Sequence, residues 1–287
     1  MTLANQDFQL FRDFLEKACG IVLGDNKQYL VKSRLRRIME ENKLSTLGDL
    51  LDRVKRTGRS SLKEVVIDAM TTNETSFFRD TRPFDIFRDT VLKYMKNNRG
   101  SKRLRIWCAA ASSGQEPYTL AIILKELAAE FPGWSFEIIG TDISKDILAQ
   151  AEKGSYSQFE VQRGMPITLL MKYFTQVEDR WEINSEIKSM IKYQPFNLLD
   201  SMASLGKFDI VFCRNVLIYF DQETKGDVLN RIKNQLESDG FLFLGGAETV
   251  IGLTDAFKVV PDKRGLYALT AGPHFGEGST LSSQALA

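Results

Sequence analysis

Small and polar residues follow four predicted strands at the points where those strands end. After the first strand comes Ala109–Glu116, a run of small and polar residues with a single glycine, Gly114. The second strand ends in Asp142, the third in Arg214 and Asn215, and the fourth in a glycine pair. Ligands of open α/β sheets bind beyond the carboxyl ends of the strands, where the strand order reverses. These residues are therefore the first candidates for a ligand site.

The loop after the first strand is a poor cradle for phosphate. It lacks the G-x-G-x-x-G pattern, and Glu116 places a carboxylate near the start of the next helix, where pyrophosphate would otherwise bind. An acid at the end of the second strand, Asp142, suits the hydroxyl groups of a ribose. Together they indicate a ligand with a sugar and no phosphate, for which S-adenosylmethionine is the common candidate. Taken singly, an acid after a strand often caps a helix, and small residues often form turns.

The composition narrows the chemistry. The single histidine, His274, lies in a Gly/Ser-rich tail, which disfavours Ser-His-Asp hydrolysis, Cys-His proteolysis and histidine-ligated zinc, and we predict no metal site. Three cysteines are too few for a disulfide framework and favour a reducing cytoplasm. Lys and Arg total 38 against 37 Asp and Glu, so the net charge does not point to nucleic acid or an acidic membrane.

Strands alternate with helices from residue 103 onward. Near-continuous apolar runs predict strands covered on both faces at Leu104–Ala110, Phe136–Asp142, Phe208–Asn215 and Phe241–Glu248. Helices are expected between them at Glu116–Phe131, from Ser144, and at Gln222–Leu236. This alternation predicts a parallel, doubly wound sheet, finished by an antiparallel pair at Phe257–Val260 and Leu266–Leu269.

The remaining regions of the sequence are predicted to form smaller structural units. Residues 6–95 read as amphipathic helices interrupted by a polar run at 70–80, with Tyr29 and Val65 on apolar faces and a capping box formed by Ser61 and Glu64. Residues 154–192 break the alternation and predict an inserted subdomain. Residues 271–287 contain little to bury and are predicted to be a disordered tail.

Five segments, in one order, closely resemble the chemotaxis-receptor glutamate O-methyltransferases (CheR-type). They are MTTNETSFFRD (70–80), SSGQEPYTLA (112–121), GTDIS (140–144), FNLLD (196–200) and FCRNVLIYF (212–220), and the match covers about residues 5–270. The resemblance implies an α/β fold: a Rossmann-like class I S-adenosylmethionine methyltransferase domain at 96–270, with a small antiparallel β-subdomain at 154–192. An all-α N-terminal receptor-docking domain and linker at 1–95 would precede it.

The resemblance also implies an activity. The enzyme would transfer the methyl group of S-adenosylmethionine to glutamate side chains of chemotaxis receptors, giving methyl esters for sensory adaptation and S-adenosylhomocysteine as the product. A glutamate with a pKa of about 4.3 is ionised at neutral pH, so it needs no general base. The lack of an available histidine agrees with that chemistry.

By matching motif positions, the resemblance assigns ten site residues. Arg79 and Tyr219 would orient the substrate carboxylate, and Arg79 would also reach the cofactor together with Asn73 and Thr75. The other cofactor-binding residues would be Glu116 at the methionine part, Asp142 at the ribose, and Asn197, Leu198, Asn215 and Val216 beside the adenine and the methionine part. From the residues alone, Arg79 could instead cap a helix, and Tyr219 could be a core aromatic.

Residues 27–59 are strongly basic, with ten Lys and Arg against four Asp and Glu. Such a run is often only a solvated face, but it also suits docking onto acidic helices. The resemblance favours the helical cytoplasmic domain of receptors as the partner and Arg34, Arg36 and Arg37 as contacts. We expect a cytoplasmic monomer that neither inserts into a membrane nor binds nucleic acid. A nucleic-acid methyltransferase and a non-catalytic cofactor-binding signalling module are the alternatives.

Overall fold

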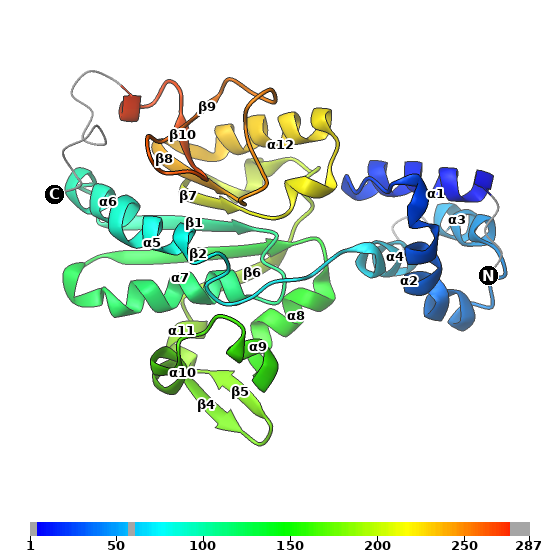
Figure 1. The fold of residues 1–287 in the computed structure, drawn as a ribbon, viewed down its shortest axis with the longest axis horizontal. Coiled ribbons are helices and arrows are strands. Elements are labelled where there is room, and N and C mark those ends of the chain that lie inside the picture. The colour runs from blue at the N-terminus through cyan, green and yellow to red at the C-terminus, as the bar shows by residue number, and fades with distance from the viewer. Residues whose placement is uncertain (1–4, 57–60, 276–287) are drawn as a thin grey trace.

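The structure is a computed structural model that describes residues 5–56 and 61–275. It has a helical lobe, on the right of Figure 1, and an α/β lobe on the left, joined by an extended linker between α4 and α5. The helical lobe contains α1 (Asn5–Cys19), α2 (Gln28–Glu41), α3 (Leu47–Arg56) and α4 (Ser61–Met70). Their apolar faces form a core of their own, which includes Phe11, Leu35 and Leu50. None of the helices within the described ranges is long and apolar enough to cross a membrane.

The helical lobe differs from the predicted pattern in detail. Tyr29 and Val65, predicted on apolar faces, are 65% and 45% exposed, so α2 and α4 bury narrower stripes than the spacing predicts. The side chain of Ser61 lies outside the described residues, and with it the predicted capping box. The Glu64 carboxylate instead accepts hydrogen bonds from the Lys145 ammonium of the α/β lobe, at 2.9 Å.

The α/β lobe is built on a seven-stranded sheet in the order β6-β2-β1-β7-β8-β10-β9. The first five strands in this order are parallel, and β10 runs antiparallel to both β8 and β9. The bounds are β1 (Arg103–Ala109), β2 (Ser135–Asp142), β6 (Ile191–Pro195), β7 (Phe208–Cys213), β8 (Leu236–Leu244), β9 (Phe257–Val259) and β10 (Leu266–Leu269). The order reverses between β1 and β7, which confirms the doubly wound sheet and puts a ligand crevice beyond the ends of these strands.

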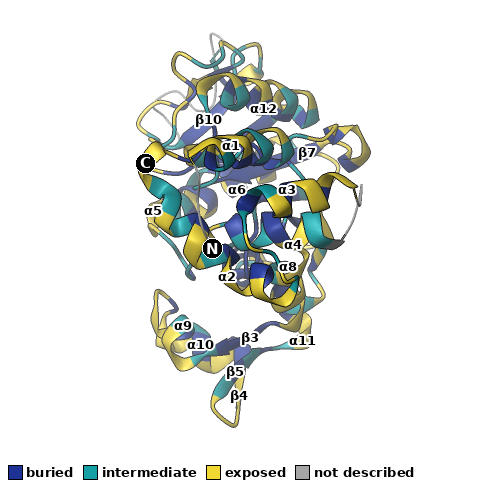
Figure 2. Ribbon diagram, turned by 90° about the vertical axis from the view of Figure 1, so that its right-hand side faces the viewer, coloured by how far each residue is buried: buried dark blue, intermediate teal, exposed yellow. Residues whose placement is uncertain are grey.

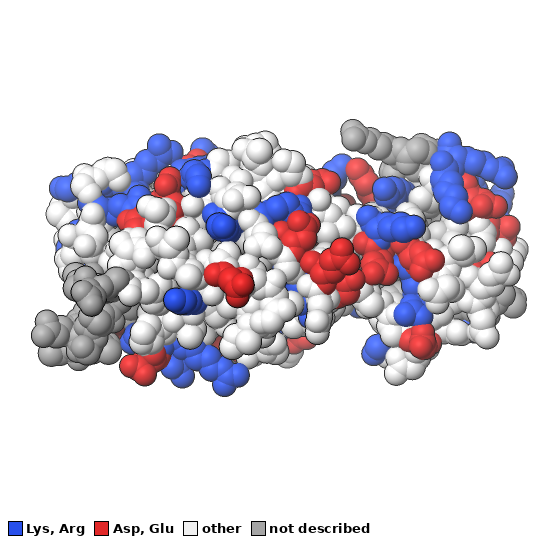
Figure 3. Space-filling model, turned by 90° about the horizontal axis from the view of Figure 1, so that it is seen from above, with Lys and Arg blue, Asp and Glu red and all other residues white. Residues whose placement is uncertain are grey.

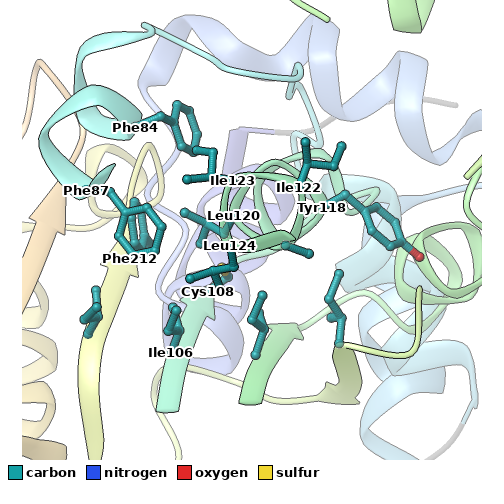
Figure 4. Packing of buried hydrophobic residues seen from close by; sticks show 14 of the residues in the cluster. Phe84, Phe87, Ile106, Cys108, Tyr118, Leu120, Ile122, Ile123, Leu124 and Phe212 are labelled. Atoms are coloured by element: carbon teal, nitrogen blue, oxygen red, sulfur yellow. The ribbon is translucent and has the colours of Figure 1, made fainter. Parts of the chain in front are cut away.

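Helices cover both faces of this sheet. Alternate residues of β1 point to opposite faces: Ile106 and Cys108 pack against α7 (Gln115–Glu126), and Trp107 and Ala109 face the core covered by α12 (Gln222–Gln235). Figure 4 shows the first face, with Phe84 and other side chains filling the space between α7 and the strands. The buried residues in Figure 2 accordingly concentrate along the sheet and the inner sides of its helices.

Two other predicted helical regions of this lobe lie where the sequence predicts them. The helix predicted at 82–95 is α5 (Arg82–Ile86), a π-helical turn, η2 (Phe87–Val91), and α6 (Leu92–Asn98). The Ser144 hydroxyl caps α8 (Lys145–Lys153), as predicted, by accepting a hydrogen bond from the Ile147 amide at 3.1 Å.

The inserted subdomain carries a separate antiparallel sheet in the order β3-β5-β4. Its strands are β3 (Ser155–Ser157), β4 (Phe174–Val177) and β5 (Arg180–Ile183), and its helices are α9 (Gln158–Gln162), α10 (Ile167–Tyr173) and α11 (Ser185–Lys188). The chain then returns to the main sheet as β6, a strand that the sequence analysis did not predict. Because β6 begins at Ile191, the predicted boundary of the insert at 192 runs two residues into the main sheet.

The predicted disordered tail begins too early. Pro273–Phe275 form a short 3-10 helix, and the His274 ring is 3% exposed, with ring centroids 4.8 Å from Tyr94 and 4.4 Å from Phe241. The first residues after 270 therefore pack on the α/β lobe. Residues 276–287 lie outside the described part.

Candidate active site

One cavity lies beyond the carboxyl ends of β1, β2 and β7. Its lining includes every cofactor-binding and catalytic residue predicted from the sequence: Asn73, Thr75, Arg79, Glu116, Asp142, Asn197, Leu198, Asn215, Val216 and Tyr219. These residues come from the linker, the start of α7, the end of β2 and the loops after β6 and β7. The strand order thus gathers side chains that lie far apart in the chain.

The floor of the cavity is shaped by the loop after β1 and the end of β2. Ala110 and Ser112 adopt left-handed φ angles of 65° and 52°, a strained conformation that often marks ligand sites. The Asp142 carboxylate holds this loop by accepting hydrogen bonds from the amides of Ser112 at 2.9 Å and Ser144 at 3.0 Å. A carboxylate has about four acceptor positions, so Asp142 retains capacity for hydroxyl donors in the cavity.

Arg214 links the cofactor side of the cavity to the linker. Its side chain is 1% exposed, and its guanidinium donates to the Glu116 carboxylate at 2.8 Å, the Asp80 carboxylate at 2.8 Å and the Arg79 carbonyl at 3.0 Å. The guanidinium also lies over the Phe84 ring, 5.5 Å from its centroid. The sequence analysis placed Arg214 at a strand end but did not assign it to the site.

The sequence predicts no role for Glu248 in the site. Its carboxylate accepts hydrogen bonds from the amides of Gly245 at 2.7 Å, Asn215 at 2.8 Å and Val216 at 3.0 Å. It therefore ties the loop after β8 to the loop after β7 and holds Asn215 at a φ of 59°. An acid two residues after a glycine pair carries no local signal for this role, because its partners are mainly 32 and 33 residues away.

Arg79 and Tyr219 both line the cavity and come from different segments of the chain, the linker and the loop after β7. The Arg79 guanidinium donates to the Glu74 carbonyl at 2.8 Å through one nitrogen, which leaves its other N–H groups for a ligand. Tyr219 is held by its backbone, since its carbonyl accepts from the Val22 amide at 2.9 Å, while its hydroxyl has no partner among the described residues. Neither behaves as a helix cap or a fully buried core residue.

The helical lobe closes part of the cavity. Cys19 and Ile21 at the end of α1 line it, and the Asn197 side-chain amide donates to the Ala18 carbonyl at 2.8 Å. The Asn197 side-chain oxygen accepts from the Leu199 amide at 3.0 Å, so both polar atoms of this side chain already have protein partners. The predicted cofactor contact of Asn197 stays a prediction.

The three arginines predicted to contact a partner do not share one environment. Arg36 and Arg37 are exposed on α2 and pair with Glu40 and Glu41 one turn away, at 2.9 and 2.7 Å. Arg34 is half-buried, and its guanidinium donates to the linker. These bonds occupy the Arg34 guanidinium within the protein, and its predicted contact with a partner stays a prediction. Figure 3 shows Lys and Arg side chains gathered at the outer end of the helical lobe.

The donor set fits S-adenosylmethionine. Asp142 offers acceptors for ribose hydroxyls, and Glu116 offers an acidic partner for an amino group at the opposite side of the loop. Helix α7 has the Glu116 carboxylate in its first turn and follows a single glycine, Gly114, without a glycine-rich turn, which does not suit phosphate. The residues present would thus hold a ligand with a ribose and an amino acid part.

A doubly wound sheet with a terminal antiparallel strand, an acid after β2 and no phosphate cradle defines the class of S-adenosylmethionine-dependent methyltransferases. Comparison with known proteins agrees: the family "CheR methyltransferase, all-alpha domain" matches residues 6–71, and "CheR methyltransferase, SAM binding domain" matches residues 73–266. The chain belongs to the CheR methyltransferase family.

Relatives extend this similarity over nearly the whole chain. "Chemotaxis protein methyltransferase 1" of Pseudomonas aeruginosa is 47% identical over 93% of this chain and 98% of its own length. "Chemotaxis protein methyltransferase Cher2" of Pseudomonas putida is 46% identical over the same shares. "Chemotaxis protein methyltransferase" of Escherichia coli is 32% identical over 90% of each chain. The protein is thus an S-adenosylmethionine-dependent methyltransferase of chemotaxis, and the nucleic-acid and non-catalytic alternatives are not favoured.

Cofactor affinity should fall on the acid side of neutrality. Burial raises the pKa of Asp142 and that of Glu116, with opposing effects from backbone amides at Asp142 and from Arg214 at Glu116. Both carboxyls therefore take up a proton at a higher pH than free carboxyls, whose pKa is about 4, and the neutral forms attract hydroxyl and ammonium donors less. We expect the Kd of S-adenosylhomocysteine, measured by calorimetry, to rise as the pH is lowered from about 7 toward 5.

The variant Asp142→Asn supplies the control. It should bind more weakly at neutral pH and depend less on pH, because one titrating group is gone. A wild-type Kd that stays constant down to about pH 4 would contradict the assignment of these carboxylates to the ligand.

Proposed function

We propose that this enzyme methylates glutamate side chains of chemotaxis receptors in the cytoplasm, acting as a monomer on the helical signalling domain. The observation that carries the proposal is the presence of Arg79 and Tyr219 in the same cavity as Asp142 and Glu116. An arginine and a phenol in one cavity suit a carboxylate acceptor, because both donate hydrogen bonds to oxygen. The sole histidine, His274, packs between Tyr94 and Phe241 and lines no part of this cavity.

The proposed reaction requires the protein mainly to position the substrate carboxylate beside the methyl group. Bound S-adenosylmethionine supplies a methyl group on a positively charged sulfur. A substrate carboxylate held by Arg79 and Tyr219 is already negative, so its oxygen bonds to the methyl carbon as the carbon–sulfur bond breaks, without proton transfer. Opposite charges attract more strongly where the walls exclude water. Orientation of two reactants can supply about 7–11 kcal/mol of a barrier.

Arg79 is held so that it orients the acceptor without neutralising it fully. One of its nitrogens is bonded to the Glu74 carbonyl, and the Glu74 carboxylate, close enough to be stabilised by Arg79, forms an ion pair with Arg163. Such sharing weakens the grip of Arg79 on any one oxygen, which preserves the nucleophilic character of the substrate carboxylate.

Transfer of a radiolabelled methyl group tests the function. Label that appears on receptor protein and is released by alkali supports a glutamate ester, since esters hydrolyse in base and methylated amines do not. Label on RNA or DNA would support a nucleic-acid methyltransferase. That class usually carries an Asn/Asp-Pro-Pro-aromatic element after the strand that corresponds to β7, where this chain has Arg214-Asn215-Val216-Leu217. The absence of label on any acceptor would indicate a non-catalytic module.

Charge reversal on α2 should separate receptor docking from catalysis. The pairs that Arg36 and Arg37 form with Glu40 and Glu41 are exposed i, i+4 pairs of low strength, so both arginines can exchange to acidic residues of a partner helix. We expect Arg36→Glu/Arg37→Glu to raise the KM for receptor about tenfold, or about 1.4 kcal/mol, and to leave cofactor affinity unchanged. Receptor kinetics equal to those of the wild type would remove this face from the docking surface.

A further inference from the structure

Arg34 is the one predicted docking residue whose side chain turns toward the rest of the protein. From α2 its guanidinium donates to the carbonyls of Met70 and Thr71, both at 2.7 Å, and to the Thr72 hydroxyl at 3.0 Å. Among residues 5–56 and 61–275, its neighbours Arg36 and Arg37 on the same helix pair only with Glu40 and Glu41 of α2. Arg34 therefore connects the basic helix to the start of the linker.

The hydrogen bonds of Arg34 replace bonds that the end of α4 cannot make. Met70 is the last residue of α4, and the final carbonyls of a helix have no partner within it. A cation at this end also interacts favourably with the helix dipole. A single guanidinium thus fixes both the helix end and the direction in which the chain leaves it.

The segment that Arg34 holds is a wall of the cofactor cavity. Six consecutive residues, Met70–Thr75, line the cavity, and they include the predicted cofactor contacts Asn73 and Thr75. Toward the α/β lobe, the segment is held by the Ser112 hydroxyl, which donates to the Asn73 carbonyl at 2.9 Å. Arg34 is the matching attachment on the helical lobe: the nearest carbonyl that it bonds, that of Thr71, lies two residues before Asn73.

We propose that Arg34 is a positioning residue for the cofactor cavity, acting through Met70–Thr72, and not a contact for the receptor. The basic face of α2 is then divided: Arg36 and Arg37 are free to meet an acidic partner, while Arg34 keeps the linker in the place where Asn73 and Thr75 reach the cofactor. The inference rests on this cavity being the S-adenosylmethionine site and is independent of the proposed acceptor.

The test is calorimetric binding of S-adenosylhomocysteine to the full chain in the absence of receptor. We expect Arg34→Gln to raise the Kd about tenfold, within the usual range of coupling between sites, because Gln cannot bond two carbonyls and a hydroxyl at once. Arg34→Lys keeps a cation for the two carbonyls and should recover most of the affinity. If Arg34 only filled space, the positive charge of the lysine in Arg34→Lys would not restore the affinity for S-adenosylhomocysteine.

The matched control is Arg12→Gln. Arg12 belongs to the same lobe and is also partly buried, with 23% of its side chain exposed, but it pairs with Asp25, away from the linker. The Arg12→Gln variant should lower the thermal stability about as much as Arg34→Gln does and leave the Kd of S-adenosylhomocysteine unchanged.

The proposal would be overturned if Arg34→Gln bound S-adenosylhomocysteine with a Kd within twofold of the wild type and had a raised KM for receptor. Arg34 would then be a receptor contact. If Arg34→Gln does not fold, Arg34→Lys decides: a small increase in Kd relative to wild type supports the proposal, and an unchanged Kd with a raised receptor KM refutes it. The Kd is measured in the absence of receptor and does not depend on the chemistry of the acceptor, so an unchanged Kd is distinct from failure to find a base-labile ester.

Discussion

Arg214→Met should destabilise the fold and abolish cofactor binding together. The substitution keeps much of the apolar stem but removes the cation between Glu116, which is 13% exposed, and Asp80. Breaking a buried pair by removing one partner typically costs about 3–5 kcal/mol, since a buried charge stays behind. That is a large fraction of the roughly 5–15 kcal/mol that holds a domain folded. Denaturant unfolding followed by fluorescence measures the change.

The double variant Arg214→Met/Glu116→Gln is the control for that explanation. It removes the orphaned charge, so part of the lost stability should return, while cofactor binding should not, because both charged groups are gone from the cavity. If the double variant is less stable than Arg214→Met alone, the cost comes from lost packing against Phe84 and not from an unpaired carboxylate.

Arg79→Ala should lower the turnover of receptor methylation by about 10- to 100-fold without unfolding the protein, less than the roughly 100- to 1,000-fold cost of removing one oxyanion-hole donor in other enzymes. Its side chain is half-exposed, and its one hydrogen bond within the protein goes to a carbonyl of the linker, so stability should change little. Initial rates of methyl transfer at saturating cofactor give kcat, and thermal unfolding checks the fold.

Arg79→Lys distinguishes charge from geometry at this position. A lysine keeps the positive charge but cannot bond the Glu74 carbonyl and a substrate carboxylate with the fixed fork of a guanidinium. We expect an intermediate turnover. Near wild-type rates in Arg79→Ala would exclude Arg79 from orienting the acceptor and would leave Tyr219 as the remaining candidate.

The sequence predicts the sheet where the strands are apolar on both faces and fails where they are not. β1, β2 and β7 lie in the middle of the sheet and read as apolar runs. β6 lies at the edge, contains Lys192 and Gln194, and ends in a proline, so its composition resembles a loop. The parallel pairing of β6 with β2 fixes it as a strand, and no local pattern encodes that pairing.

As with the sheet, one part of the site could be predicted from the sequence and another part could not. Residues at strand ends and in the polar run were found from strand order and from family resemblance, and the structure brings all ten into one cavity. The residues that hold them were missed: Arg214 and Glu248 act through partners dozens of residues away in the sequence. Arg34 was found for its charge, yet its three bonds to the linker depend on how α2 packs beside α4.

The pH dependence of methyl transfer in a single turnover most directly tests whether an already ionised carboxylate reacts without a base. With cofactor and receptor saturating, we expect the rate constant to be constant between about pH 6 and 9, because the acceptor glutamate has lost its proton well below this range. A rate constant that rises through a pKa within that interval would show that a group must first give up its proton, and it would contradict the account.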